Sequence, residues 1–394
     1  MKVLFDHQAF QMQHVGGVSR YFTALLEGIP SASLSLKYTD NIHVKALDRF
    51  KGTLQSRDAE FADFAFGLDF RGKRRLYRSW NRLRGRVVDA NLDASIKALK
   101  SGDYEVFHPT YYDPYFLPYL GGKPFVLTIH DMIHELFPEF FSLSEPTGRN
   151  KRLLAERADR IIAVSERTKQ DIVEIFGIPD SRIDVIYHGS DLKTAFDRPA
   201  PRVVEGRYIL YTGTRTAYKN FHFMVAALAP LFRENPDLSL VCTGPDFSSE
   251  EVTYFQEIGV LQAVKHRFVR DSELAGLYGN AMCFVFPSYY EGFGIPILEA
   301  FGCGCPVVLS DASCFREVAD DAALYFEPKS GGSLRQSVRS LLDDAKLAAE
   351  MVGKGRERAR KFCWSSTVEG TMRVYDKAVG DGAGNKTGDR AARP

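Results

Sequence analysis

The sequence predicts an α/β protein with two domains, each built on a parallel sheet. The chain has 394 residues, which is more than one hydrophobic core usually serves. Short apolar runs typical of strands buried on both faces recur along it, and helical patterns separate them. Prolines and charge interrupt this alternation at 197–201, which is the predicted linker. We therefore expect an N-terminal domain over 1–198 and a C-terminal domain over 199–362.

Composition narrows the classes of function. A net charge of +1 gives no global attraction to nucleic acid or to a membrane, and we expect no nucleic-acid partner. Charge interrupts the first apolar residues at Asp6, and no stretch of about 18 apolar residues occurs. The six cysteines show neither zinc-site nor disulfide spacing. We expect a cytoplasmic protein with reduced cysteines.

The N-terminal domain is expected to open with a strand at 2–6, a loop with paired glycines and a helix. The loop contains Gly16 and Gly17, but no G-x-G-x-x-G pattern follows the strand, which argues against a dinucleotide fingerprint. A plain strand-to-helix turn is one interpretation of this pair. Apolar residues at i, i+3, i+4 and i+7 predict the buried stripe of the helix, made of Phe22, Leu25, Leu26 and Ile29.

Further apolar runs predict the rest of this domain. One run ends in His130 and Asp131, and a histidine at the carboxyl end of a parallel strand faces the ligand-binding edge of the sheet. A satisfied structural histidine is the alternative. Residues 132–150, with two prolines, predict a mobile connection over the cleft. The other expected elements are strands near 33–47 and at 106–109, 125–131, 161–165 and 183–189, and a helix over 166–176.

Residues 71–86 form a basic amphipathic segment. It holds eight basic side chains and no acid, with Leu76, Tyr77, Trp80 and Leu83 spaced for one helix face. Such a segment can lie on an anionic membrane surface or bind a phosphate-bearing partner. A solvated helix whose apolar side packs on the domain is an equal alternative.

The C-terminal domain is expected to open with a strand at 208–211 and a loop that carries Arg215 and Lys219. Asn220 is a plausible N-cap for the next helix. Two cations beside a helix N-terminus can neutralise a diphosphate leaving group as its charge develops. Solvation of both cations at the surface is the alternative. The helix is predicted from its stripe of Phe221, Met224, Val225 and Leu228.

The stretch 282–301 combines a strand at 283–286, a glycine-hinged loop and a helix start. Gly292 and Gly294 let a ligand approach the main chain, and Pro296 suits the first position of a helix. The free N–H groups of a helix that begins there favour a bound phosphate. We therefore expect an anion site at this loop.

Two carboxylates flank this expected anion site. Glu291 lies on the loop and Glu299 about one turn into the helix, so both can face one cleft. Because acids repel phosphate, we assign them to neutral partners such as sugar hydroxyls, which donate well to carboxylates. In the alternative interpretation, Glu291 caps the helix and Glu299 lies on a solvated face.

The sequence EGFGIPILEA at 291–300 resembles the Glu-x7-Glu motif of the family-4 retaining glycosyltransferases. This resemblance implies the GT-B fold, in which two Rossmann-like domains with parallel sheets face each other across a cleft. It covers nearly the whole chain except about 31–100.

The resemblance implies phosphate contacts on both sides of the cleft. Gly16 and Gly17 would lie under the donor diphosphate and near the acceptor. Arg215 and Lys219 would stabilise the departing nucleotide diphosphate. The main chain of the 292–297 loop would assist them, through Gly292, Phe293, Gly294 and Ile295.

The resemblance also implies sugar contacts. His130 and Glu291 would hold the transferred sugar, with Asp131 fixing the histidine ring. Glu299 would hold the ribose hydroxyls. The segment 266–278 resembles the nucleobase-side loop, except that Arg267 stands where a glycine is usual, which puts the local backbone path in doubt.

The end of the chain also follows the family pattern. A helix over 363–379, which begins with the aromatic-Ser pattern of Trp364, is expected to return to the N-terminal domain. The tail 380–394, rich in Gly, Asp and Lys, is expected to be disordered.

The expected function is metal-independent transfer of a hexose from a nucleotide-diphosphate sugar to a glycan or lipid-diphosphate-linked acceptor. GGVSRYF is similar to bacterial mannosyltransferases of surface-polysaccharide synthesis, which favours GDP-mannose as donor substrate. No metal or cofactor is expected, since no Asp-x-Asp pair occurs. A sugar-nucleotide epimerase and a non-catalytic sugar-nucleotide-binding protein are the alternatives.

Overall fold

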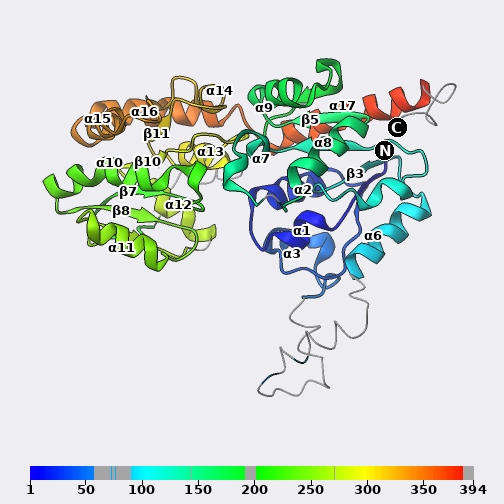
Figure 1. Ribbon diagram of the computed structural model, residues 1–394, viewed down its shortest axis with the longest axis horizontal. Coiled ribbons are helices and arrows are strands. Elements are labelled where there is room, and N and C mark those ends of the chain that lie inside the picture. Colours follow the sequence, from blue (N-terminus) through cyan, green and yellow to red (C-terminus); the bar gives the residue numbers. More distant parts are fainter. Residues whose placement is uncertain are drawn as a thin grey trace.

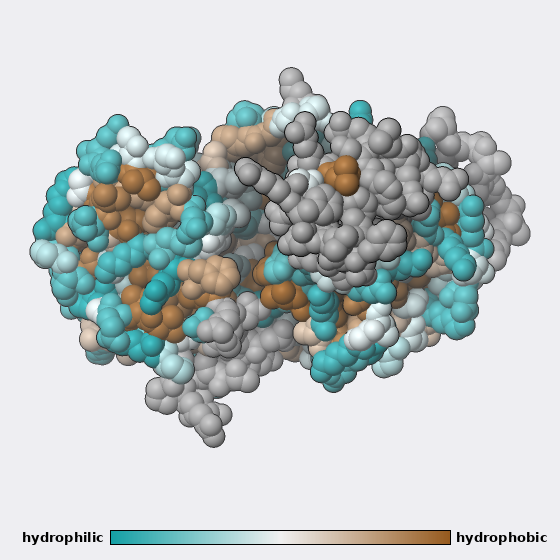
Figure 2. All heavy atoms as spheres, turned by 90° about the horizontal axis from the view of Figure 1, so that it is seen from below, coloured by the Kyte–Doolittle hydropathy of each residue, from teal (hydrophilic) through white to brown (hydrophobic). Residues whose placement is uncertain are grey.

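The computed structural model shows two α/β domains side by side (Figure 1). It describes residues 1–56, 72, 76, 90–142, 144–190, 201–269 and 271–384. Seen from the face in Figure 2, the domains form two lobes in which hydrophilic side chains surround scattered apolar ones.

Among the described residues, the N-terminal domain contains six parallel strands in two three-stranded sheets, ordered β2-β1-β3 and β4-β5-β6. A parallel bridge between Phe107 and Phe125 joins the sheets, so β3 lies beside β4. The strands are β1 (Val3–Phe5), β2 (Ala32–Leu34), β3 (Val106–His108), β4 (Val126–Ile129), β5 (Arg160–Ala163) and β6 (Ile183–Val185). Each predicted strand is present, but several end earlier than predicted: the one near 33–47 at Leu34, the one over 125–131 at Ile129 and the one over 183–189 at Val185.

Helices cover this sheet, and α2 carries the predicted apolar stripe fully buried. The strand expected up to residue 47 is wrong beyond residue 34, because Asn41 begins a helix by accepting a hydrogen bond from the Val44 N–H. Within the connection predicted over 132–150, residues 133–136 and 138–140 form short helices and 147–150 begin the helix α8. The α-helices are α1 (Gln8–Met12), α2 (Gly17–Gly28), α3 (Ile42–Ala46), α6 (Ala90–Ser101), α7 (Ile133–Leu136), α8 (Thr147–Arg157) and α9 (Glu166–Asp171). Shorter turns are η1 (Asp48–Phe50), η2 (Pro114–Tyr119), η3 (Pro138–Phe140), the π-helix η4 (Ile172–Phe176) and η5 (Asp180–Arg182).

The C-terminal domain has one six-stranded parallel sheet, ordered β12-β11-β10-β7-β8-β9. Successive residues of β10 enter opposite cores, Phe284 and Phe286 on one face and Cys283 and Val285 on the other. This is the doubly buried strand that the apolar run predicts. The strands are β7 (Arg207–Tyr211), β8 (Leu238–Cys242), β9 (Val264–His266), β10 (Cys283–Phe286), β11 (Val307–Ser310) and β12 (Leu324–Phe326).

The strand order of this sheet indicates where a ligand would bind. The chain runs outward from β7 to β9 on one side, and from β10 to β12 on the other. Ligands bind such sheets outside the carboxyl ends of the strands, where the order reverses. The loops after β7 and β10 therefore lie side by side, joined by a 2.9 Å bond from the Tyr289 N–H to the Tyr218 carbonyl. The helices are η7 (Ala217–Lys219), α10 (Phe221–Glu234), α11 (Ser249–Glu257), α12 (Asp271–Gly279), α13 (Ile295–Gly302), α14 (Phe315–Ala319), α15 (Gly331–Asp343) and α16 (Ala345–Ala359).

Helix α17 (Trp364–Gly384) returns to the N-terminal domain, as predicted (Figure 1). Its Val374, Tyr375 and Ala378 are buried in the core that also contains β1 and α2. The helix continues five residues beyond the predicted end at 379, so 380–384 are helical and not a disordered tail.

Several predicted segments lie outside the described residues. These are the linker at 197–200, the tail at 385–394, and the basic segment 71–86 apart from Gly72 and Leu76. The membrane contact expected of 71–86 therefore stays a prediction. Within the described part of the chain, no helix is both long and apolar enough to cross a bilayer.

The two domains meet through the loop after β10. A Cβ added to Gly292 would lie 1.6 Å from the His130 carbonyl oxygen, so the two main chains are in direct contact. The Thr168 hydroxyl donates to the Gly292 carbonyl at 3.3 Å, and the Tyr290 hydroxyl donates to Asp171 at 2.6 Å. This loop therefore holds the carboxyl ends of both sheets together.

Gly292→Ala tests this contact. Gly292 is not in the left-handed region, so the added methyl group acts by overlap with backbone that cannot move aside. We expect a loss of stability of about 1–3 kcal/mol, seen as a lower Tm in calorimetry. Because the overlap separates the two halves of the cleft by about an ångström, activity should fall about 100-fold.

Gly353→Ala is the matched control, because nothing lies within 4 Å of its added Cβ on α16. It should leave activity unchanged and keep or raise the Tm, since alanine favours helix. Unchanged activity and Tm in Gly292→Ala would show that the two main chains are not in contact in solution.

Candidate functional site

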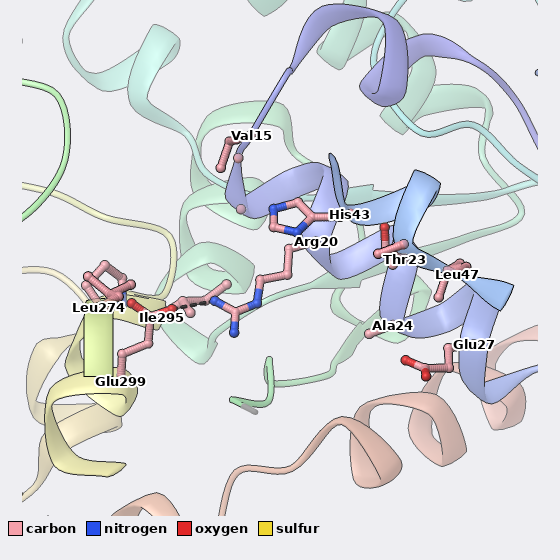
Figure 3. A pocket seen from close by; sticks show the side chains of 14 residues that line it. Val15, Arg20, Thr23, Ala24, Glu27, His43, Leu47, Leu274, Ile295 and Glu299 are labelled. Atoms are coloured by element: carbon pink, nitrogen blue, oxygen red, sulfur yellow. Dashed lines mark hydrogen bonds and ion pairs between the residues drawn. The ribbon is translucent and has the colours of Figure 1, made fainter. Parts of the chain in front are cut away.

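A cavity of about 540 Å³ opens between the two domains. The structure brings the two predicted glycine loops together there, since a Cβ on Gly17 would lie 3.9 Å from the Ile295 side chain. Figure 3 shows side chains from α2 and α13 on opposite sides of this space. The lining residues used below are Gly16, Gly17, Arg20, Ile295, Pro296 and Glu299.

Helices α2 and α13 both begin at this cavity. Gly294 caps α13 in the left-handed region at φ 100°, which explains the glycine there. Gly16 caps α2 in extended backbone, where a Cβ would overlap the Gln13 side chain at 2.4 Å. Gln13 uses that space to accept a bond from the Ser19 N–H. Two positive helix ends therefore border one space, and that arrangement favours a bound anion.

Glu299 lies on α13 and is nearly buried, with a side-chain exposure of 7%. One carboxylate oxygen accepts a hydrogen bond from Arg20 across the domain boundary, and the other accepts from the Tyr278 hydroxyl at 3.3 Å. The sequence analysis placed Glu299 in the cleft but missed Arg20. Arg20 could have been recognised as a cleft residue from its position, three residues after Gly17 and in the first turn of the predicted helix.

Glu291 and Lys219 form an ion pair at 2.5 Å where the loops after β7 and β10 meet. The Ser288 hydroxyl donates to the same carboxylate oxygen at 2.7 Å, and Ser313 bonds to both the N–H and the carbonyl of Glu291. Burial alone would lower the pKa of Lys219, but the charge of Glu291 outweighs it and the pKa lies above its usual value. Lys219 is therefore a fixed cation at this edge of the sheet.

Arg215 is paired with a carboxylate that the sequence analysis did not predict. Its guanidinium forms two bonds to Glu251 of α11, at 2.5 and 3.1 Å, and lies over the Phe247 ring. Asn220 also differs from expectation. It occupies the N-cap position in the left-handed region, but its side chain donates to the Pro328 carbonyl instead of capping α10. Both differences arise from partners far away in sequence.

His130 follows β4 and faces aromatic rings. Its ring lies edge-on to Tyr21 at 5.2 Å, and its Nε2 is buried with no hydrogen-bond partner. Burial lowers the pKa of His130 to about 4, against the attraction of neighbouring Asp131. The imidazole is therefore neutral at pH 7, and its buried Nε2 is left without a hydrogen bond.

Asp131 does not hold the His130 ring as expected. Its carboxylate accepts from the Ile133 N–H at 3.1 Å and lies 3.7 Å from the ammonium group of Lys151. Burial raises the pKa of Asp131, but Lys151 and the Ile133 N–H outweigh it and leave the pKa below its usual value. Lys151 is itself buried and also binds Glu135 at 2.9 Å. Asp131 thus fixes the turn after β4.

His188 is a second buried histidine beside His130, and the sequence analysis did not name it. It lies beyond β6 as His130 lies beyond β4, and the two rings stack at 5.8 Å. Its Nδ1 is also buried without a partner. The Phe293 ring packs edge-on against His188, with 5.2 Å between the ring centroids. The Phe293 side chain is therefore part of this aromatic cluster, and only its main chain remains for the contacts predicted of the 292–297 loop. The strand followed by a histidine was the available signal.

The backbone conformation at Arg267 does not require a glycine. Its N–H donates to the Cys242 carbonyl at 2.9 Å, which extends the β8–β9 pairing by one residue, and its φ is not positive. Its side chain approaches the Val203 carbonyl at 3.5 Å. Among the described residues, no cluster of His, Cys, Asp and Glu has the arrangement of a metal site.

Comparisons with known proteins agree with this geometry. The chain is 28% identical over 287 residues to O-antigen chain mannosyltransferase B of Escherichia coli, covering 69% of this chain and 74% of that protein. It is 29% identical over 278 residues to D-inositol 3-phosphate glycosyltransferase of Kineococcus radiotolerans, covering 62% and 63%. O-antigen chain mannosyltransferase RfbU of Salmonella typhimurium is 27% identical, with 55% and 60% covered.

Solved structures support the fold. Anabaena HepE in complex with UDP-glucose superposes with a TM-score of 0.71 at 17% identity, covering 95% of this chain and 99% of that one. Sucrose-phosphate synthase from Thermosynechococcus elongatus gives 0.67 at 18% identity, covering 96% and 99%.

Two family models match consecutive parts of the chain. Residues 15–194 match Glycosyltransferase Family 4, and residues 193–358 match Glycosyl transferases group 1. The two matches meet at residues 193–194, a few residues before the linker predicted at 197–201. With two Rossmann-like domains and the cleft described above, the chain belongs to these glycosyltransferases of the GT-B fold.

Proposed function

We propose that the protein is a retaining mannosyltransferase that uses GDP-mannose and acts on a glycan or lipid-diphosphate-linked acceptor in surface-polysaccharide synthesis. The observation that carries the chemistry is the cavity where the N-termini of α2 and α13 meet Glu299. The named O-antigen mannosyltransferases among the relatives favour mannose as the transferred sugar and a surface polysaccharide as the product.

Different residues of the cleft would bind different parts of the donor. Glu299 would accept hydrogen bonds from the ribose hydroxyls, and the two helix N-termini would hold the diphosphate. Lys219 would neutralise the charge that develops on the leaving group. Glu291 and the neutral His130 would hold the sugar, with Glu291 close to the positive charge that builds at the anomeric carbon.

The transfer step needs no nucleophile from the protein. The acceptor hydroxyl oxygen forms a bond to the anomeric carbon as the bond from that carbon to the diphosphate oxygen breaks. The bonding electron pair leaves with the diphosphate, and that oxygen takes the proton of the acceptor hydroxyl. Because attack and departure occur on the same face of the sugar, the configuration is retained.

A thermal-shift panel of nucleoside diphosphates and sugar nucleotides tests this function. A ligand that binds only the folded state raises the Tm, by an amount set by its concentration relative to its Kd. We expect GDP and GDP-mannose to give the largest shifts. A larger shift with UDP-glucose would exclude the donor proposed here, and no shift with any member would exclude the function.

Turnover should not require a divalent metal, because Lys219 and the helix N-termini supply the positive charge that a metal would otherwise provide. Transfer of labelled mannose should proceed at an unchanged rate in EDTA. Complete loss of turnover that manganese restores would contradict this expectation.

The two glutamates should fail differently when changed to glutamine. Glu291→Gln removes charge beside the reacting carbon, so it should lower kcat at least about tenfold with little change in the donor KM. Glu299→Gln acts on ribose hydroxyls, which are held equally in the substrate and in the transition state, so it should chiefly raise the donor KM. Donor titration at saturating acceptor measures both parameters.

Glu234→Gln is the matched control, since Glu234 forms a surface pair with Arg339 outside the cleft residues. This variant should have the same kcat and the same donor KM as the wild type. The reverse pattern for Glu291 and Glu299 would exchange their roles, and full activity of both variants would exclude the motif as the donor site.

We propose that the basic segment 71–86 attaches the enzyme to anionic lipid. This rests on its eight cations and interleaved aromatic residues, since its structure lies outside the described residues. Changing Arg74, Arg75, Arg78 and Arg82 to Ser should weaken sedimentation with anionic liposomes in low salt and leave GDP binding unchanged. Equal sedimentation of variant and wild type would contradict this proposal.

A further inference from the structure

Ser313 has a backbone conformation that serine rarely adopts. Its φ is 54°, in the left-handed region, where every residue except glycine meets a steric cost. Among the described residues, Asn220 and Asp320 are the other non-glycine residues with a positive φ. Such a conformation persists when the surrounding contacts impose it, and it is common at functional sites. The contacts of Ser313 therefore indicate what this conformation serves.

The Ser313 side chain holds the main chain of Glu291. Its hydroxyl oxygen accepts a hydrogen bond from the Glu291 N–H at 3.2 Å and donates one to the Glu291 carbonyl at 2.7 Å. A hydroxyl can form both bonds at once because it has one proton and two lone pairs. One side chain therefore fixes the main chain of Glu291 on both sides of its Cα.

Cys314 adds a second support to the same loop. Its buried thiol donates to the Glu291 carbonyl at 3.3 Å and to the Phe293 carbonyl at 3.1 Å. Burial raises the pKa of this thiol well above its usual value, and the charges of Glu317 and Glu291 act in the same direction. The thiol therefore keeps its proton at neutral pH and remains a donor to these carbonyls.

The carboxylate of Glu291 is held by other residues. Lys219 pairs with it from the loop after β7, and the Ser288 hydroxyl donates to it at 2.7 Å. Ser288 is itself tied to the end of β11, because the Ser310 hydroxyl donates to the Ser288 carbonyl. The segment after β11 thus restrains the main chain of the loop, whereas Lys219 and Ser288 restrain the charged group.

The role proposed for Glu291 requires this restraint. Its charge would stabilise the positive charge that builds at the anomeric carbon, an interaction that is strongest in the transition state. The rate depends steeply on such placement, since a shift of about 1 Å can cost about 100-fold. The two bonds from Ser313 to the main chain of Glu291 limit a shift of this kind.

We propose that Ser313 is a positioning residue, which fixes the main chain of Glu291 and acts on the transfer step through the Glu291 carboxylate, with Cys314 as a second support. This inference rests on the proposed function, because it requires Glu291 to act on the reacting sugar. The strained backbone at Ser313 is the conformation that brings its hydroxyl to both main-chain groups of Glu291.

Two substitutions separate the hydroxyl of Ser313 from its strained backbone. Ser313→Ala removes the hydroxyl and keeps the strain, whereas Ser313→Gly removes both. Both variants should lower kcat at least about tenfold, while the donor KM and the Kd for GDP stay within about twofold of wild type. Ser313→Gly should have a higher Tm than Ser313→Ala, because glycine adopts the positive φ without cost. A wild-type kcat in either variant would overturn the inference.

Asp320→Gly is the matched control. Asp320 has a φ of 53° at the end of α14, so the same kind of strain is relieved at a residue whose side chain pairs with Arg358. This variant should have the same kcat as the wild type.

A double-mutant cycle tests whether Ser313 acts through the carboxylate. In the Glu291→Gln background the charge that Ser313 positions is already absent, so Ser313→Ala should lower kcat by less than about twofold. A further loss as large as in the wild-type background would show that Ser313 acts on another group and would overturn the inference.

Amide hydrogen exchange gives a measurement that does not depend on activity. Ser313→Ala should speed exchange of the Glu291 amide proton, because that N–H loses its acceptor, and Asp320→Gly should leave the rate unchanged. Equal exchange in Ser313→Ala and wild type would show that Ser313 does not hold Glu291 in solution, contrary to the inference.

The outcomes separate the two proposals. Failure of the wild-type protein to bind GDP and to transfer a hexose would overturn both the function and this inference. Wild-type turnover that Ser313→Ala and Ser313→Gly retain would overturn only the inference.

Discussion

The cleft depends on one close contact, between the main chain of Gly292 and the carbonyl of His130. No side chain can enter between the two loops, so the carboxyl ends of the two sheets are held at backbone distance. This contact joins the loop that carries Glu291 to the segment in which His130 follows β4. A glycine in the middle of a strand-loop-helix corner thus fixes the arrangement of two domains, beyond the local turn.

Charge in the cleft is balanced in pairs. Lys219 is paired with Glu291, Arg20 with Glu299 and Arg215 with Glu251. Each pair limits the cost of placing a charge in a partly buried position, since an unpaired charge there would be strongly destabilising.

Local sequence patterns predicted much of the fold and part of the site. The strands β3, β4, β5 and β10 and the stripe of α2 follow from apolar runs and from the 3.6-residue period, which reflect burial of nearby residues. Glu291, Glu299 and the glycines were found because a short motif carries them. The partners of Arg215, Asn220 and Asp131 could not be predicted, because Glu251, Pro328 and Lys151 reach them only through the tertiary fold.

The neutral state of His130 shows how distant segments tune the site. The ring packs with Tyr21 of α2 and with His188, and His188 in turn contacts Trp364 at the start of α17. These neighbours exclude water, and this exclusion lowers the pKa of His130 to about 4. The C-terminal helix therefore helps to keep His130 uncharged through His188, because Trp364 closes part of the apolar environment around these rings.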